Sequence, residues 1–319
     1  MSGRLLTLVA LWGVMVVGVV CAEDVPLPQP QDQPAQQKLA RIWMNEPPLV
    51  RLARNRFDEA FTETDAKFFA AVAENGWADF RAAGDVKFDA EKPDSWDASP
   101  TLPVDRIQWL CTDPDAVKLV PSRGIWLRGV NVVGQLDLYR SEVPFSITIY
   151  DCLLGGGMNL AHAKLQELDV RNCCTAAVKA RGAHVEESVC LCNTVVFGGV
   201  DFIDANVGGD FDFAGGLAFH GTVQDDLAKP GVALTLYDAH VDGDIRLADG
   251  FRSFGEVRLL GVRVGRSINC RGGNFHSAGP DAIDADRCQV EGNVYLGLGF
   301  ESNATVTLRH GVSPRRPPI

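Results

Sequence analysis

An apolar-x-apolar phrase that returns every eleven residues constrains this chain more than any other feature. The phrase reads IWL at position 125, LDL at 136, ITI at 147 and MNL at 158. Alternation with a period of two is typical of a strand with one buried face. Because strands this short cannot form the hairpins of a large sheet, we expect each one to pair with its equivalent in the next coil of a solenoid. The phrase recurs at positions 168, 200, 211, 234, 245, 257, 268, 283, 294 and 306.

Each unit has a second half, in which a small residue lies five places after the first apolar residue and an apolar residue often follows two places later. Val262 interrupts this column of small residues. Asp, Asn or Gly separates the two halves, and these residue types favour the tight turn of a corner. The corner residues are Asp151, Asn172, Asp204, Gly215, Asp238 and Gly272. The small column contains Ser141, Cys152, Ala163, Cys173, Ala205, Gly216, Ala239, Gly250, Gly273, Cys288, Gly299 and Gly311.

Two units would form one coil of about 22 residues. If residues 177–199 hold two degenerate units, sixteen units predict about eight coils, stacked over roughly 38 Å at ~4.8 Å per coil. Inserts follow Phe219 and Phe275, four units apart, so both loops should leave the same side of the solenoid. The β-branched residues and frequent Gly exclude the alternative source of an eleven-residue period, a right-handed coiled coil. The sequence therefore predicts an all-β fold, a parallel β-helix over residues 121–312.

The N-terminus has the pattern of an export signal. Arg4 precedes an uncharged run over residues 5–20, and Val20 and Ala22 suit positions −3 and −1 of a cleavage site before Glu23. We therefore expect residues 1–22 to be a signal peptide and the mature protein to be periplasmic or secreted.

Two alternatives to a cleaved signal remain. The first is an uncleaved membrane anchor, because the uncharged run over residues 5–20 is near the lower length limit for a membrane span. A lipoprotein would use Cys21, but Val20 is large where a small residue is wanted. Each alternative also places the rest of the chain outside the cytoplasm. Residues 23–40, rich in Pro and Gln, predict an extended linker.

Residues 41–120 predict a helical cap for the first coil. Thr62 suits an N-cap with Asp65 three residues later, and Gly76 suits the end of that helix. A second short helix should have Pro103 in its first turn and carry Ile107, Leu110 and Trp109, with the Trp109 ring as an apolar plug on the first coil.

The C-terminal tail, residues 313–319, contains Arg315, Arg316 and three prolines and no further helix. We expect this tail to guard the last coil only partly, because the end of a stack of strands leaves unpaired N–H and C=O groups. The open edge could then pair with a second copy in an edge-to-edge homo-oligomer.

The segments from RIQWL at 106 to LDL at 136, FRSFGEVRLLGVRVG from 251 and INCRGGNF from 268 resemble a family of bacterial right-handed β-helix proteins related to the pentapeptide-repeat proteins. The resemblance covers about residues 52–312. It implies a right-handed helix and the order of its parts, but no activity. Some members are labelled membrane-associated oxidoreductases. This chain contains neither a GxGxxG motif between strand and helix nor a CxxC motif, so we expect no redox cofactor.

Eight cysteines would remain after cleavage, and export permits disulfides. Cys152, Cys173 and Cys288 occupy the small column and Cys270 an inward strand position, which favours buried apolar thiols. Cys152 and Cys173 are one coil apart and should stack. The alternative is a disulfide among Cys173, Cys174, Cys190 and Cys192, whose pairing the sequence leaves open.

Charged residues suggest several weaker sites. His240, Asp242 and Asp244 in HVDGD could bind a divalent ion, but solvated Asp is expected at such a turn, and we predict no metal site. Outward positions carry Asp137, Asp169, Asp201, Asp212 and Asp284, and Arg246 and Arg258 interrupt what reads as the same column. A DNA mimic would need an unbroken acidic stripe. The basic stretch of Arg246, Arg252, Arg258, Arg263, Arg266 and Arg271 fits either an acidic-glycan site or a solvated face.

Two classes of function remain, and no catalytic residue is identified. The net charge of −11 argues against nucleic acid and anionic membrane surfaces as partners. The first class is a non-catalytic envelope scaffold or binding protein, whose partner is an envelope protein or a polysaccharide. The second is a carbohydrate-active enzyme, a lyase or hydrolase. Only Asp225 and Asp226, in the longer insert, stand where a long loop could wall a groove, so we favour the scaffold.

Overall fold

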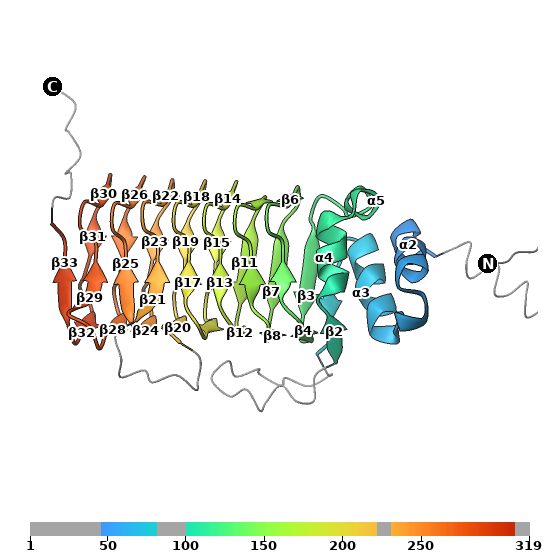
Figure 1. Ribbon diagram of the computed structural model, residues 1–319, viewed down its shortest axis with the longest axis horizontal. Helices are drawn as coiled ribbons and strands as arrows, with labels where there is room; N and C mark the ends of the chain where they lie inside the picture. The colour runs from blue at the N-terminus through green and yellow to red at the C-terminus, as the bar shows by residue number, and fades with distance from the viewer. Residues whose placement is uncertain (1–45, 82–99, 222–230, 310–319) are drawn as a thin grey trace, which may run out of the picture. The chain divides into compact units, whose positions relative to one another are not determined.

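A computed structural model describes residues 46–81, 100–221 and 231–309 (Figure 1). These residues belong to one compact unit, Glu46–Ile319. The predicted signal peptide and linker, Asp225 and Asp226 in the insert, and the tail 313–319 lie outside the described residues.

Four parallel sheets, here named A to D, form the walls of a β-solenoid. Sheet A contains β1 (Ala78–Asp79), β3 (Ile125–Arg128), β7 (Ile147–Tyr150), β11 (Leu168–Arg171), β15 (Val189–Cys190), β19 (Phe211–Asp212), β23 (Ile245–Arg246), β27 (Ile268–Asn269) and β31 (Val294–Tyr295). Sheet B contains β2 (Thr101–Pro103), β4 (Asn131–Val133), β8 (Leu153–Leu154), β12 (Cys174–Thr175), β16 (Val195–Val196), β20 (Leu217–Phe219), β24 (Arg252–Phe254), β28 (Asn274–His276) and β32 (Glu301–Ser302). Sheet C contains β5 (Leu136–Asp137), β9 (Met158–Asn159), β13 (Val178–Lys179), β17 (Val200–Asp201), β21 (Val232–Thr235), β25 (Glu256–Arg258), β29 (Asp281–Asp284) and β33 (Thr305–Thr307). Sheet D contains β6 (Glu142–Val143), β10 (Lys164–Leu165), β14 (His184–Val185), β18 (Asn206–Val207), β22 (His240–Val241), β26 (Arg263–Val264) and β30 (Gln289–Val290).

The predicted coil is confirmed. Each coil passes through sheets A, B, C and D in turn, and each strand pairs in parallel with its equivalent in the next coil, as Ile125 does with Ile147 and Ile147 with Leu168. One eleven-residue unit supplies sheets A and B, and the next supplies C and D. The degenerate stretch 177–199 contains the expected strands, with Val178 and Val189 at the first positions of two units.

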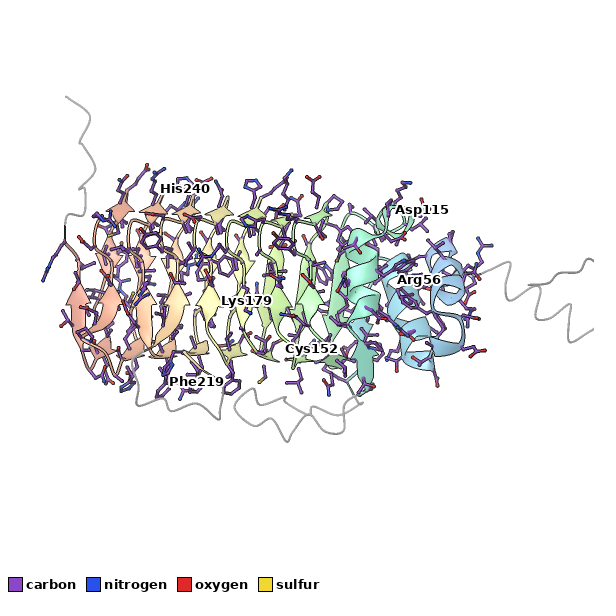
Figure 2. All side chains as sticks on the ribbon, in the orientation of Figure 1. Arg56, Asp115, Cys152, Lys179, Phe219 and His240 are labelled. Carbon is purple, nitrogen blue, oxygen red and sulfur yellow. A yellow bond between two sulfur atoms is a disulfide. The ribbon has the colours of Figure 1, made fainter. Side chains whose placement is uncertain are left out.

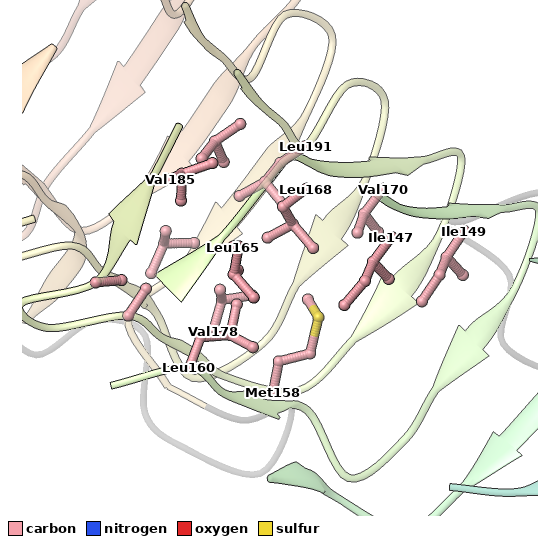
Figure 3. Packing of buried hydrophobic residues seen from close by; sticks show 14 of the residues in the cluster. Ile147, Ile149, Met158, Leu160, Leu165, Leu168, Val170, Val178, Val185 and Leu191 are labelled. Atoms are coloured by element: carbon pink, nitrogen blue, oxygen red, sulfur yellow. The ribbon is translucent and has the colours of Figure 1, made fainter. Parts of the chain in front are cut away.

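The inward residues form one continuous apolar core along the coils. In Figure 3, Ile147 and Leu168 from sheet A face Met158 and Val178 from sheet C across the interior, and Leu165 completes the packing from sheet D. A short inward side chain follows most corners, as Ala205 and Ala239 do, but the prediction for Gly250 is wrong, because Gly250 is exposed and Phe251 is fully buried in the inward place. Val262 interrupts the column in the sequence, yet its side chain is fully buried at the equivalent inward position.

The corners have the backbone conformation that their residue types predict. All six predicted corner residues adopt a positive φ, for example Asp151 at 49°, Asp238 at 52° and Gly272 at 67°. Asn, Asp and Gly tolerate this left-handed region better than other residues. Both inserts join sheet B to sheet C, after β20 and after β28, so they leave the solenoid at the same corner as expected.

Helices α2 (Pro48–Phe57), α3 (Glu63–Ala73), α4 (Asp105–Thr112) and α5 (Pro114–Val117), with the 3₁₀ turn Asp58–Ala60, precede the first coil. Strands of this coil contact α3 and α4. The capping box of Thr62 and Asp65 is present as predicted. The Asp65 carboxylate also accepts from Arg106 Nε at 2.9 Å, and this buried pair joins α3 to α4.

Two details of the cap differ from expectation. Pro103 ends strand β2, not the first turn of a helix, because Thr101 and Leu102 pair with β4 and an edge strand tolerates a residue without N–H. Trp109 does not plug the first coil. Its ring contacts Phe57 and Phe69 within the helical layer, at centroid distances of 5.5 and 5.7 Å.

The last coil has no strand partner in the described part of the chain. Strands β30 to β33 each stand at the end of their sheet. Apolar side chains are exposed here, with Leu298 at 83% and smaller fractions for Val294 and Leu308.

The small column makes a stability prediction. Ala239 is fully buried, so Ala239→Leu should lower the free energy of unfolding by roughly 1–3 kcal/mol through overpacking. The control Asp201→Asn should change it by less than about 0.5 kcal/mol, because Asn retains the acceptor for the Ile203 N–H. Urea unfolding of both variants is the measurement, and equal losses would contradict the assigned inward positions.

Candidate functional site

The outward acidic residues do not form one column. Successive units alternate between faces, so Asp137, Asp201 and Asp284 lie on sheet C, whereas Asp169 and Asp212 lie on sheet A. The two interrupting arginines separate in the same way, with Arg258 on sheet C and Arg246 on sheet A. The single stripe predicted from the repeat is therefore wrong, because two units make one coil.

Four of these five carboxylates have a structural role. Asp137, Asp201, Asp212 and Asp284 each accept a hydrogen bond from the backbone N–H two residues later, at 3.0 to 3.1 Å. Such a bond stabilises the turn that ends the strand. This local bond explains why Asp recurs at the middle of the phrase.

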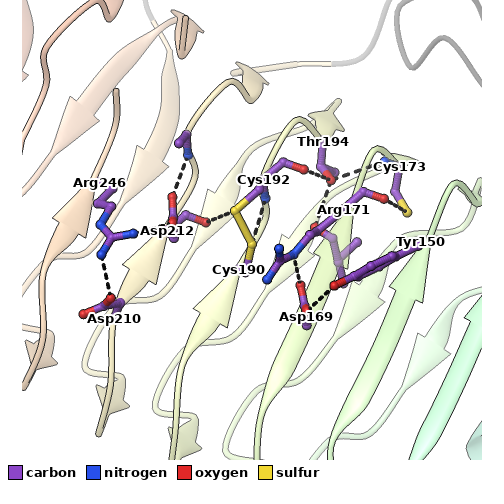
Figure 4. The surroundings of a disulfide bond; sticks show 12 residues. Tyr150, Asp169, Arg171, Cys173, Cys190, Cys192, Thr194, Asp210, Asp212 and Arg246 are labelled. Carbon is purple, nitrogen blue, oxygen red and sulfur yellow. Dashed lines mark hydrogen bonds and ion pairs between the residues drawn. A yellow bond between two sulfur atoms is a disulfide. The ribbon is translucent and has the colours of Figure 1, made fainter. Parts of the chain in front are cut away.

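Asp169 is the exception. It is only 8% exposed, although it points outward from sheet A. Its carboxylate accepts from the Tyr150 hydroxyl at 2.8 Å and from Arg171 Nε at 2.7 Å, contacts that Figure 4 shows. Burial of the Tyr150 phenol, together with its bond to Asp169, raises the pKa of Tyr150 to about 12. The carboxylate thus orients both an aromatic ring and a guanidinium group.

An aromatic cluster adjoins this carboxylate. Trp77, just before β1, lies 4.6 Å from the Trp126 ring on β3 and 5.1 Å from the Tyr150 ring on β7. Arg123 stacks over Trp126 at 3.4 Å. Sequence reasoning missed this cluster. The outward placement of Trp126 and Tyr150 on neighbouring coils could have indicated part of it, but Trp77 comes from the cap.

Glu167 is a second residue that the sequence did not single out. It is half-buried and stands two residues before Asp169, immediately before β11. Burial raises the pKa of Glu167, and the nearby negative charges of Glu187 and Asp169 add to this effect, whereas a hydrogen bond from Ser146 opposes it. A carboxylic acid with a raised pKa can hold a proton nearer neutral pH.

The cysteines divide into two groups. Cys190 and Cys192 form a disulfide on the outer side of sheet A, at the centre of Figure 4. The remaining described cysteines are free and buried, as the apolar interpretation predicts. Cys152 and Cys173 stack, with a hydrogen bond from the Cys152 N–H to Cys173 Sγ at 3.4 Å. Burial raises the pKa of the Cys152 thiol to about 12, so it is poorly suited to act as a nucleophile.

The HVDGD motif does not gather its three side chains. His240 Nε2 lies 2.7 Å from Asp242 Oδ1 on the outer surface at sheet D, where Figure 2 labels the histidine. Asp244 instead accepts from the Ser267 N–H and approaches Arg246 on the sheet A side. Within the described ranges, no group of three His, Cys, Asp or Glu side chains could hold a metal ion.

The basic stretch does not form one face either. Arg246 lies on sheet A, Arg252 on B, Arg258 on C and Arg263 on D. The four residues belong to one coil, and each coil contributes one strand to every sheet. Arg246 donates to Asp210 at 3.0 Å and to Asp212 at 3.1 Å. These four arginines therefore lie on four different walls and do not together form an acidic-glycan site.

Comparisons with protein-family models, with curated proteins and with solved structures found no match for this chain. None of the helices in the described ranges combines the length and the apolar character that crossing a membrane requires.

Tyr150 offers a direct test of the site. In a spectroscopic titration we expect it to ionise near pH 12. Asp169→Asn should lower the pKa of Tyr150, because the negative charge that opposes the phenolate is removed, but burial should keep it above the ordinary value of about 10. Because the folded-state pKa is raised, the stabilisation is complete below about pH 10 and is lost as pH rises through about 12.

The control for this titration is the exposed Tyr139 on the far side of the coil. Tyr139→Phe should leave the step near pH 12 in place, and Tyr150→Phe should remove it. A step that persists in Tyr150→Phe would contradict the assignment.

Proposed function

We propose that this protein is an exported, non-catalytic scaffold or binding protein of the bacterial envelope, with the outer face of sheet A as its binding surface. The observation that carries the proposal is Asp169, the outward acid that no turn requires and that orients Tyr150 and Arg171. Side chains held in this way present a fixed surface to a partner. The partner is an envelope polysaccharide or protein.

Charge pairing on this face supports binding over catalysis. Asp169 pairs with Arg171, Asp212 with Arg246 and Asp151 with Arg128, all within 3.1 Å. Carboxylates and guanidinium groups that are already paired with one another form a fixed polar surface and leave few free groups for acid–base chemistry. The pattern of residues 1–22 supports export, and the resemblance of residues 52–312 to bacterial β-helix proteins related to the pentapeptide-repeat proteins agrees with a scaffold. The proposed activity needs no cofactor, and the net charge of −11 disfavours nucleic acid.

A carbohydrate-active enzyme is the second candidate, favoured by Glu167. A half-buried acid with a raised pKa beside a second carboxylate resembles the pair of acidic residues that glycosidases need. Glu167 immediately precedes β11 and Asp169 lies on it. Residues two apart along an extended chain are about 6.6 Å apart at the backbone, which allows the carboxyl separation of inverting enzymes.

Fractionation of native-host cells tests the first proposal. We expect the mature chain to begin at Glu23 and to remain with the envelope. Arg171→Glu on sheet A should release the protein from the envelope several-fold more readily, because the new carboxylate repels Asp169 and disrupts the binding surface. Lys179→Glu, an equivalent reversal at an exposed position on sheet C, should not.

Three outcomes would contradict the scaffold. Intact Met1 in the soluble cytoplasm would exclude export, and equal behaviour of the two variants would exclude sheet A as the binding face. Cleavage of a polysaccharide, detected by new reducing ends or unsaturated products and lost in Glu167→Gln, would establish the enzyme instead.

We further propose that the open end of the solenoid binds a second copy. Among the described residues, the strands of the last coil have no partner and apolar side chains are exposed beside them, whereas helices contact the first coil, so assembly should stop at a pair. Light scattering of Leu298→Lys should show less dimer than the wild type. The control is Leu119→Lys, an exposed leucine beside α5.

The tail has its own expected result in the same measurement. Deletion of residues 313–319 should raise self-association, because prolines and charges that discourage strand pairing are removed. A truncated chain that stays monodisperse at high concentration would contradict a guarding tail, and equal dimerisation of the two leucine variants would contradict the open end.

A further inference from the structure

The residues around Asp169 form a cluster that has the features of a small-ligand site. We name Trp77, Trp126, Tyr150, Asp169 and Arg171 the sheet A cluster. Trp126 Nε1 donates to the Arg123 carbonyl at 3.1 Å, and the Tyr150 hydroxyl donates to Asp169. Arg123 lies over one face of Trp126 at 3.4 Å and Arg171 lies over Tyr150 at 5.4 Å, so the surface left to a ligand is the partly exposed remainder of the three rings. Aromatic surface of this kind packs against the C–H faces of sugar rings.

Arg171 adds hydrogen-bond donors at the edge of the rings. Its Nε is held by Asp169, and its side chain is 46% exposed. Among the described residues, its two terminal nitrogens have no hydrogen-bond partner. A guanidinium fixed through one nitrogen presents the others in a defined plane, which suits a pair of neighbouring hydroxyl groups.

The charged groups around the cluster balance one another, because three ion pairs are joined by one further basic residue, Arg123 over Trp126, and one further acidic residue, Glu167. Asp79 pairs with Arg81 at 2.6 Å, Asp151 with Arg128 at 2.6 Å and Asp169 with Arg171 at 2.7 Å. An anionic polymer would therefore meet no excess positive charge here, and the net charge of the chain would repel it. The balance favours an uncharged ligand that offers both hydroxyl groups and apolar ring faces.

We infer that the sheet A cluster binds a neutral glycan. Trp126, Tyr150 and Arg171 stand on three successive strands of sheet A, so they extend over about 10 Å at ~4.8 Å per strand, the length of roughly two sugar units. The glycan would lie along the solenoid axis, with its rings against the aromatic side chains and its hydroxyl groups on Arg171. This inference rests on the proposed function and names the class of its ligand.

Affinity electrophoresis and calorimetry of the mature protein test the inference. The probes are laminarin, hydroxyethyl cellulose and chito-oligosaccharides as neutral glycans, and polygalacturonate as the acidic one. We expect saturable binding of at least one neutral probe and none of polygalacturonate. Trp126→Ala and Arg171→Ala should each weaken binding at least tenfold, because they remove a stacking surface and the free donors.

The matched control is Tyr139→Ala, which removes an exposed aromatic ring from the other side of the coil and should leave binding unchanged. If Trp126→Ala does not fold, Arg171→Ala decides the question, because its side chain is at the surface. Binding of polygalacturonate alone, or neutral-glycan binding that survives Arg171→Ala, would overturn the inference.

The glycan class and the proposed function can fail separately. If no neutral probe binds but Arg171→Glu still releases the protein from the envelope, the ligand class is wrong and the binding face stands. If Arg171→Glu has no effect on envelope retention, the proposed function itself fails.

Discussion

Hydrogen bonding between equivalent strands of successive coils is the constraint on which this structure depends. Most strands contain only two residues, so none could persist as an isolated hairpin. Each one is stable because a nearly identical strand lies on either side, as Val189 lies between Leu168 and Phe211. The same dependence makes the two ends special, because helices lie beside the first coil and, within the described ranges, the last coil has no strand partner.

Parallel stacking also determines where chemistry can occur on the surface. Every outward position becomes a column along one wall, so a side chain is surrounded by the residues one coil before and after it. On sheet A this places Tyr150 and Arg171 in one column, and Asp169 bridges them. Asp169 and Asp212 belong to the neighbouring column, and there Asp212 accepts from the backbone N–H two residues later and stabilises a turn.

The repeat made much of the fold predictable. Corner residues such as Asp238, the stacking of Cys152 on Cys173 and the capping box at Thr62 all follow from local rules or from the period. The candidate site was harder to predict from the sequence. Asp169 has the same place in its phrase as Asp212, and only the positions of Tyr150 and Arg171 distinguish their roles.

The sequence by itself determined the coil, because apolar alternation, small corner residues and an eleven-residue period admit one way of burying the apolar face. The two-unit coil that the period predicts also means that successive units lie on different walls. Closure of two units into one coil separates residues that the period makes equivalent, which is why the acidic and basic columns divided among the sheets. Only the tertiary structure brought Trp77 from the cap to Trp126 and Tyr150, because contacts between the cap and the solenoid have no period in the sequence.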